Sequence, residues 1–313
     1  MTETANVSVF ASALLLTVTV EPGDDQEVGA GIHVHPGGQG FWVARMVRHL
    51  GERPILSAPI GGEIGVVLAS LVPEWGVELA AIKIEANSPA YVHDRRNGVR
   101  REIAESPAPV LDRHEIDDLY SRTFETALST GLCVITARFA QGGVPHDFYR
   151  RLGSDLASTG VVVVGDLHGD DMAAYLEGGP IDVLKVSVDD LKADDAITGS
   201  SQEQILSAMA KLSDLGAKAI VVSGADSATF ARFGQSIYRA TQPSLETVDH
   251  RGSGDSMTAA IAVGLRRGFD STSIIELACA AGAANVVRHG LGNADADLID
   301  QLKGLVTIEE ISE

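Results

Sequence analysis

The sequence has few cysteines, few aromatic residues and few basic residues. Its two cysteines, Cys133 and Cys279, lie among apolar neighbours, which gives neither a disulfide framework nor a metal-ligand spacing. Lys and Arg total 24 against 43 Asp and Glu, so the formal net charge is −19. A chain this acidic lacks the clustered cations that bind nucleic-acid backbones or anionic membrane surfaces. We therefore expect neither nucleic acid nor a membrane as a partner.

Long hydrophobic runs are also missing. The apolar stretch nearest the N-terminus, residues 9–20, is too short to cross a bilayer. It has no basic segment before it and no clear cleavage site, so we interpret it as strand rather than as a signal peptide. Buried free thiols fit a reducing compartment, and together these features predict a cytoplasmic protein.

Apolar residues nevertheless make up 45% of the 313 residues, in short β-branched runs that alternate with amphipathic helical segments. We expect buried strands at 132–136, 161–164, 183–186 and 219–222, with helices between them. This alternation is typical of a mostly parallel sheet covered by helices on both faces, a three-layer α/β/α core. Strand candidates clustered between 77 and 104 predict a second, smaller sheet.

The clearest candidate for chemistry is the turn Gly252-Ser253-Gly254, followed at Asp255 by an alanine-rich helical run. Free N–H groups and the positive dipole end at a helix start form an anion site. A carboxylate there would repel a bound phosphate. We therefore interpret Asp255 as a general base for a hydroxyl that attacks a phosphoryl group held by the amides. Taken alone, the pattern fits an ordinary helix-start aspartate equally well.

Two other glycine-rich turns precede helical segments, at 36–40 and 61–65. Each lets a ligand approach the backbone closely, or simply makes a tight strand–helix connection. Neither carries the Gly-x-Gly-x-x-Gly fingerprint, which argues against a nicotinamide-dependent oxidoreductase. His33 and His35 share one strand face, but with no third ligand nearby we favour exposed or interface histidines over a metal site.

Ligands of parallel sheets bind beyond the carboxyl ends of the strands. That rule selects Arg138, Asp166, residues 185–190 and residues 223–224. In an arbitrary protein a strand-end lysine such as Lys185 is more often a plain surface cation.

In this order, the motifs resemble those of the ribokinase-like (pfkB-type) carbohydrate kinases, nearest the 1-phosphofructokinase and tagatose-6-phosphate kinase branch. The resemblance covers nearly the whole chain, and its most specific motif is Gly-Ser-Gly-Asp at 252–255. The other motifs are Gly-Gly-x-Gly at 37–40 with Val-Ala-Arg at 43–45, Gly-Gly-x-x-Gly at 61–65, the segment 143–149, Asp166, and Lys185 with Asp-Asp-Leu at 189–191.

The resemblance implies one kinase domain over residues 1–313, with a β-sheet lid formed by about 7–35 and 77–106. ATP would be the co-substrate and Mg²⁺ the cofactor, and the acceptor would be a sugar-like small molecule. Lids of this family often pair between subunits, and an exposed sheet edge suits such pairing, so a homodimer is expected.

The resemblance also assigns roles to residues. Asp255 would be the catalytic base, and the amides of Gly252, Ser253 and Gly254 would stabilise the transferring phosphoryl group. The nucleotide would contact Lys185, Ser187, Ser223, Gly224 and Asn285, and the metal would be held through Asp190 and Asp166. The acceptor would contact Gly37, Gly38, Gln39, Trp42, Leu15 and Arg138.

Several positions depart from the family pattern. Leu15 stands where the family has a sugar-binding Asp, Gln39 where it has Lys, and Trp42 where it has Asn. The lid segment 87–90 lacks the family's Arg, although Arg138 could replace one cation. In the metal motif, Ser187 and Asp190 replace Asn and Glu, which predicts weaker magnesium binding.

These departures remove the charges that grip the phosphate of a phosphosugar, and charge-assisted bonds are the strong ones. The sequence therefore predicts an acceptor other than fructose 1-phosphate or fructose 6-phosphate. A nucleoside, a deoxy or methylated sugar, or an aromatic molecule would suit Trp42 and Leu15. The alternative is a non-catalytic ligand-binding or regulatory protein on the same scaffold. The altered acceptor residues favour that alternative, and the intact Gly-Ser-Gly-Asp motif favours the kinase.

Overall fold

The computed structural model describes residues 6–22, 31–139, 143–224, 228–243, 245, 251–286, 292 and 294–312. Residues 23–30 of the predicted lid and residues 246–250 before the glycine turn lie outside these ranges. Among the described residues, no helix is both long enough and apolar enough to cross a bilayer.

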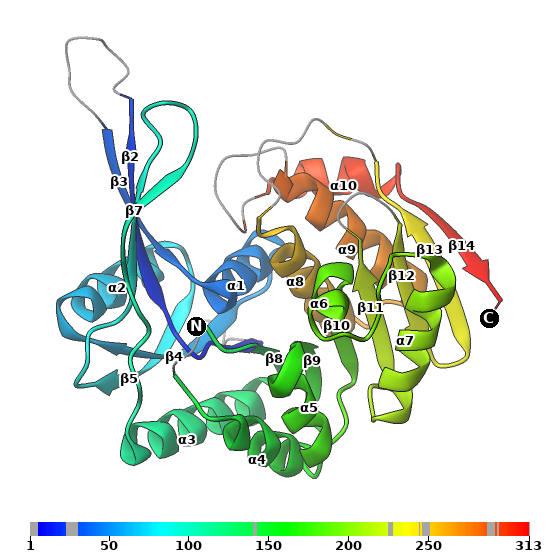
Figure 1. Ribbon diagram of the computed structural model, residues 1–313, viewed down its shortest axis with the longest axis horizontal. Helices are drawn as coiled ribbons and strands as arrows, with labels where there is room; N and C mark the ends of the chain where they lie inside the picture. Colours follow the sequence, from blue (N-terminus) through cyan, green and yellow to red (C-terminus); the bar gives the residue numbers. More distant parts are fainter. Residues whose placement is uncertain are drawn as a thin grey trace.

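A ten-stranded sheet runs through the middle of the described chain (Figure 1). Its strands are β1 (Val7–Phe10), β4 (Pro54–Gly61), β5 (Glu78–Ile84), β8 (Leu132–Thr136), β9 (Val162–Asp166), β10 (Val183–Ser187), β11 (Ala219–Ser223), β12 (Thr229–Phe233), β13 (Ser236–Thr241) and β14 (Thr307–Ile311). Their spatial order is β14-β13-β12-β11-β10-β9-β8-β1-β4-β5. The strands from β11 to β5 are parallel, and β12, β13 and β14 extend the sheet in antiparallel fashion.

Helices cover both faces of this sheet. One face carries α1 (Gln39–His49), α2 (Gly62–Glu74), α8 (Ser253–Arg266), α9 (Ser271–Val286) and α10 (Ala296–Lys303). The other carries α3 (Arg113–Thr130), α4 (His146–Leu156), α5 (Gly169–Gly178), α6 (Val188–Ala193) and α7 (Gln202–Asp214). Side chains alternate along a strand, so β8 sends Leu132 and Val134 to the first core and Cys133 and Ile135 to the second. The predicted three-layer α/β fold is confirmed.

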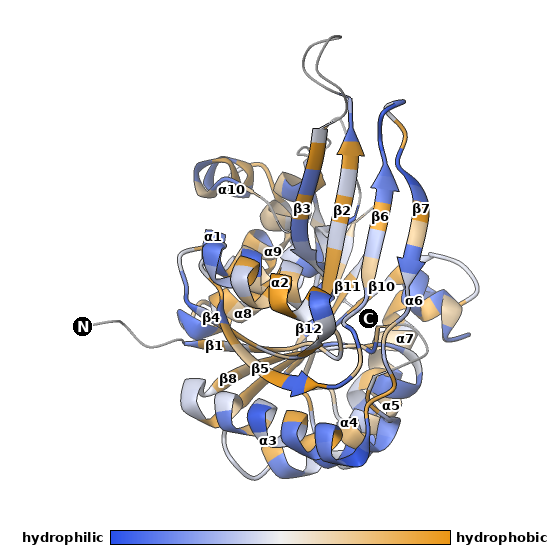
Figure 2. Ribbon diagram, turned by 90° about the vertical axis from the view of Figure 1, so that its left-hand side faces the viewer, coloured by the Kyte–Doolittle hydropathy of each residue, from blue (hydrophilic) through white to orange (hydrophobic). Residues whose placement is uncertain are grey.

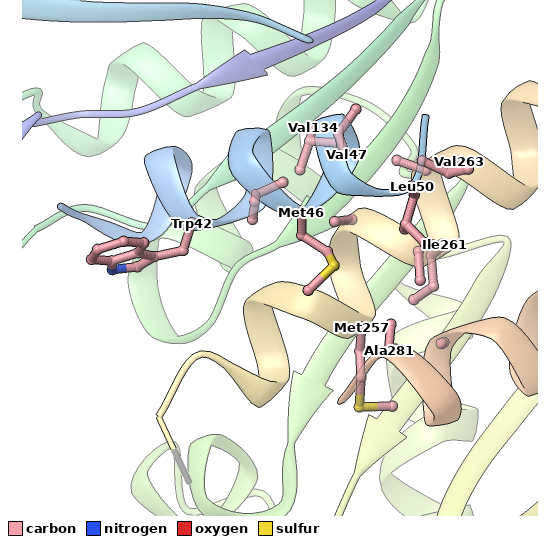
Figure 3. Close-up of a cluster of buried hydrophobic side chains, with 14 of the residues drawn as sticks. Trp42, Met46, Val47, Leu50, Val134, Met257, Ile261, Val263 and Ala281 are labelled. Carbon is pink, nitrogen blue, oxygen red and sulfur yellow. The ribbon is translucent and has the colours of Figure 1, made fainter. Parts of the chain in front are cut away.

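The core under α1 and α8 supports the start of α8. Met46 of α1 and Leu50, which directly follows α1, face Met257 and Ile261 of α8 (Figure 3). Trp42 lies at the N-terminal end of the same row. Because all these side chains are buried and closely packed, α1 and α8 have little freedom to shift relative to each other.

A second sheet of four strands stands upright from the core (Figure 2). It consists of β2 (Leu15–Glu21), β3 (Gly31–Gly37), β6 (Ala90–Asp94) and β7 (Arg101–Ser106), in the order β3-β2-β6-β7. Strands β2 and β6 are parallel, and the outer pairs are antiparallel. We call these four strands the small sheet.

The limits predicted for the lid, 7–35 and 77–106, were too wide. Val7–Phe10 pairs with β4 and β8, and Glu78–Ile84 pairs with β4, so both strands belong to the large sheet. The four residues of β1 are all buried, as expected for an inner strand covered on both faces. The chain leaves the large sheet after Phe10 and enters the small one at Leu15. A run of apolar residues predicts a strand but not the sheet to which it belongs. Only the pairing of the strands in the structure assigns each one to the large or the small sheet.

Candidate active site

The predicted glycine turn opens α8. Gly252 has a φ of +78°, a left-handed conformation that favours glycine, and no side chain caps the helix start. The Gly252 carbonyl accepts bonds from the Ser256 N–H at 2.9 Å and the Ser256 hydroxyl at 2.7 Å. The first N–H groups of α8 have no intrahelical partners, which is the arrangement that the anion site expected from the sequence requires.

Two side chains anchor this turn to α9. Ser253 Oγ donates to the Gly282 carbonyl at 3.2 Å, and Asn285 Nδ2 donates to the Arg251 carbonyl at 2.7 Å. Asn285 is 1% exposed, so its amide lies inside the protein and supports the chain entering the turn. Its predicted place beside a nucleotide base stays a prediction.

Asp255 lies in the first turn of α8 and is half-buried. Burial, followed by the negative charge of Asp166, raises the pKa of its carboxyl to about 7, against the opposing effect of Lys185. A base whose pKa lies near neutrality can both accept and release a proton in a catalytic cycle.

This pKa gives a testable pH dependence. Only the ionised Asp255 can take a proton, so turnover is expected to rise as pH increases through about 7 and to level off above it. Initial rates at saturating substrates across this range measure the effect. An acid limb near the ordinary aspartate pKa of about 4 would contradict the assignment.

Lys185 and Asp166 form a buried ion pair behind the turn. Lys185 Nζ lies 3.3 Å from Asp166 Oδ1, and the two residues are 5% and 4% exposed. Burial lowers the pKa of Lys185, but the charges of Asp166 and Asp255 outweigh it and raise that pKa overall. The amine therefore stays protonated. A Cβ built on Gly254 would lie 2.5 Å from Lys185 Nζ, so the ammonium rests directly against the turn.

A third residue, Thr258, completes this cluster and was missed in the sequence. Its hydroxyl donates to Asp166 Oδ2 at 2.6 Å and lies 3.1 Å from the Gly254 carbonyl. Both carboxylate oxygens of Asp166 are thereby engaged. Its spacing could have identified it, because Thr258 is three residues after Asp255 and therefore lies on the same side of the helix.

The other predicted nucleotide residues gather at the same edge of the large sheet. Ser187 and Ser223 are register partners at the ends of β10 and β11, and Ser223 Oγ donates to the Val186 carbonyl at 3.4 Å. Gly224 follows directly and is half-buried. The structure thus brings these residues together with Lys185, as the strand-end rule predicts.

Ser187 and Asp190 form a capping box at the start of α6. Asp190 Oδ2 accepts from the Ser187 N–H at 2.8 Å and from its hydroxyl at 2.6 Å, and the Asp190 N–H donates back to Ser187 Oγ at 3.0 Å. Within the described residues, no group of three or more His, Cys, Asp or Glu is placed to hold a metal ion. Magnesium does not require one, because it keeps several waters and takes one or two carboxylates plus substrate phosphates. Asp190 fits that pattern, whereas Asp166 is already paired on both oxygens.

On the acceptor side, Leu15, Gly37 and Trp42 are packed together. Leu15 is 4% exposed and Trp42 7%. A Cβ on Gly37 would lie 2.7 Å from Leu15 Cδ1 and 3.2 Å from Trp42 Cζ2. The Trp42 ring centroid lies 6.0 Å from that of His35. Both side chains are buried around Gly37, so they expose less surface than the aromatic face and apolar wall expected from the sequence. Their role toward an acceptor stays a prediction. Gly38, with a φ of +104°, precedes α1, and Gln39 is half-buried.

Arg138, expected as a spare cation, is half-buried and paired with a carboxylate. Its Nε donates to Asp171 Oδ1 at 2.7 Å and its backbone N–H to Asp171 Oδ2 at 2.8 Å. Arg138 Nη2 also lies 3.1 Å from His146 Nε2. Asp171 is 5% exposed and neutralises this guanidinium. The sequence could not show this, because Asp171 is 33 residues away and lies in the first turn of α5.

An aromatic contact joins the small sheet to the core beside Arg138. Tyr91 of β6 meets Phe139 edge-on, with ring centroids 5.9 Å apart, and stacks on His93 at 5.7 Å. The Phe139 N–H donates to Ser12 Oγ at 2.9 Å, which fixes the chain after β8. These residues bring the small sheet to the same edge as the cluster around Asp255.

Comparison with known proteins relates this chain to a family and a fold. The family model for pfkB family carbohydrate kinase matches residues 5–297. The ATP-dependent 6-phosphofructokinase isozyme 2 of Mycobacterium tuberculosis is 27% identical over 294 residues, covering 92% of this chain and 86% of its own. The crystal structure of phosphofructokinase-2 from Escherichia coli with potassium has a TM-score of 0.84 at 22% identity, covering 96% of this chain and 99% of its own. At this level of identity, the similarity to the Escherichia coli structure shows that the two chains share a fold.

Proposed function

The chain belongs to the pfkB family of carbohydrate kinases, and from this premise we propose that it transfers the terminal phosphoryl group of ATP to a hydroxyl of a sugar or sugar-like small molecule. The observation that carries the proposal is Asp255, with a pKa of about 7, at the uncapped start of α8 and close to Lys185. A base, an anion site and a buried cation are the parts that phosphoryl transfer requires.

In the proposed reaction, Asp255 accepts the proton of the acceptor hydroxyl as its oxygen attacks the phosphoryl group. The free N–H groups at the start of α8 receive the charge that develops on the phosphoryl oxygens. Lys185, held against Gly254, adds a fixed positive charge on the same side. Magnesium, when bound with ATP through Asp190, would neutralise phosphate charge.

We further propose that the acceptor carries no phosphate of its own. Gln39, Leu15 and Trp42 replace charged or polar family residues, and both Leu15 and Trp42 are buried. The charge of Arg138 is compensated by Asp171. A phosphate dianion at this position would lack the charge-assisted bonds that such a group needs. The relative in Mycobacterium tuberculosis is named a 6-phosphofructokinase, so this is a proposed divergence within the family.

The test begins with the nucleotide. Millimolar Mg-ATP is expected to raise the melting temperature, because a ligand that binds only the native state stabilises it. An acceptor screen with unphosphorylated sugars, nucleosides and fructose phosphates then follows, with ADP release as the readout. We expect the best acceptor to be unphosphorylated. Efficient turnover of fructose 6-phosphate would refute the acceptor proposal, and no thermal shift with Mg-ATP would favour the non-catalytic alternative.

We also propose a homodimer through the small sheet. Ile32 and Val34 of β3 are 69% and 43% exposed and lie on one face of the sheet, where Val34 aligns with Val18. On the opposite face, Thr17 and His93 are buried. An exposed apolar sheet face of this kind suits pairing with a second copy.

Ile32→Asp combined with Val34→Asp is expected to convert the dimer to monomer, because two carboxylates would be buried at the interface. Light scattering after size-exclusion chromatography measures the change. Leu215→Asp, at a 59% exposed position after α7, is the matched control and should leave the mass unchanged. A monomeric unmodified protein would contradict the proposal.

A further inference from the structure

Thr258 closes a circuit of contacts around the anion site. It lies on α8, its hydroxyl donates to Asp166 at the end of β9, and Asp166 pairs with Lys185 on β10. Lys185 in turn touches Gly254 at the start of α8. The three side chains are between 0% and 5% exposed, so water does not compete for these contacts.

These contacts fix the orientation of the Asp166 carboxylate. The carboxylate has two oxygens, and Thr258 takes Oδ2 at 2.6 Å while Lys185 takes Oδ1 at 3.3 Å. The shorter bond belongs to the neutral hydroxyl. Without that hydroxyl, Asp166 is free to turn both oxygens to Lys185, since a buried carboxylate keeps as many bonds as it can. The ammonium would then be drawn away from Gly254.

We propose that Thr258 is a positioning residue that holds Asp166 in one orientation and thereby keeps the Lys185 ammonium against the Gly252–Gly254 turn, where the transferring phosphoryl group binds. This inference rests on the proposed kinase function and adds a residue to its site. Thr258 is fully buried, and its hydroxyl contacts Asp166, so it acts through Asp166 and Lys185. Its effect therefore falls on the transfer step more than on nucleotide binding.

Thr258→Val removes the hydroxyl and keeps the side-chain shape. The rate constant for Mg-ATP turnover is expected to fall on the order of 10- to 100-fold, as for other displacements of a group by about 1 Å. The dissociation constant for Mg-ATP should change much less, and Thr258→Ser should restore the rate. Thr130→Val is the matched control, because Thr130 is also buried but its hydroxyl bonds only to backbone carbonyls of the α3–β8 segment.

A double-mutant cycle separates positioning from general structural damage. If Thr258 acts through Lys185, Thr258→Val should cost no further turnover once Lys185→Met is in place. An equal loss in both backgrounds, or a wild-type rate in Thr258→Val alone, would overturn the proposal. Water serves as the acceptor in these assays if no better acceptor is found.

Crystal structures of the unmodified protein and of Thr258→Val test the same idea without any activity. We expect Asp166 to rotate in the variant and Lys185 Nζ to move away from Gly254. An unchanged pair in the variant would overturn the inference. If the unmodified protein neither binds nor consumes Mg-ATP, the proposed function fails, and the crystal comparison still decides whether Thr258 positions Lys185.

Discussion

Replacing Asp255 by asparagine is expected to lower turnover on the order of 10²- to 10⁴-fold, the usual contribution of a positioned general base. Asparagine keeps the size and the hydrogen-bonding shape of the side chain but cannot accept a proton. Mg-ATP binding should be largely spared, because the N–H groups at the start of α8 and Lys185 are unchanged. Initial rates and a Mg-ATP thermal-shift titration measure the two effects separately.

The thermal stability of Asp255→Asn shows whether a loss of turnover comes from unfolding. Asp255 has a pKa raised in the folded protein, so the stability that it contributes is fully present at low pH and is lost as pH rises through about 7. At pH 8, where the buried carboxylate is charged, asparagine removes that charge and should not lower the melting temperature. Near-normal turnover in a folded Asp255→Asn protein would remove Asp255 as the base.

Gly254→Ala is the second substitution with a large expected effect. The added Cβ would lie 2.5 Å from Lys185 Nζ, well inside contact distance, and Lys185 has little freedom to move because it is buried and paired with Asp166. The methyl group would also stand beside the N–H groups that receive the phosphoryl oxygens. Removing a single donor to such a site costs about 10²- to 10³-fold in rate, and we expect a fall of that order.

The control for this change is Gly304→Ala. Gly304 also lies at a helix end, has a right-handed φ of −63°, and a Cβ there would be 3.8 Å from its nearest neighbour. It should leave turnover unchanged. Unchanged kinetics in Gly254→Ala would show that Lys185 and the turn are not packed as the structure indicates. If the substitution unfolds the protein, the melting temperature will fall, which distinguishes unfolding from a specific loss of turnover.

Much of the fold follows from local patterns in the sequence. The alternation of short apolar strands with amphipathic helices predicted the three-layer arrangement, which is confirmed. The glycine turn before an alanine-rich segment located the start of α8 and the position of Asp255 on it. These signals are local because a left-handed glycine and a helix start depend on a few adjacent residues.

The acceptor side was predicted less well. Leu15 and Trp42 were identified as departures, but the burial of both side chains around Gly37 was not predicted. Arg138 was expected to offer a free charge, whereas Asp171 and His146 hold it. In each case the missing partner comes from a different element of the chain, and residue type alone does not reveal which side chains will meet.

By itself, the sequence determined the order of the elements, the family, and the carboxylate at the start of α8. Only the tertiary structure decided that β1 and β5 join the large sheet, that Arg138 is neutralised, and that Lys185 is held between Asp166 and Gly254. The physical reason is distance along the chain. Helix starts and strand periodicity are set by neighbouring residues, whereas ion pairs such as Lys185–Asp166 and bonds such as Thr258–Asp166, 92 residues apart, exist only after the strands have paired.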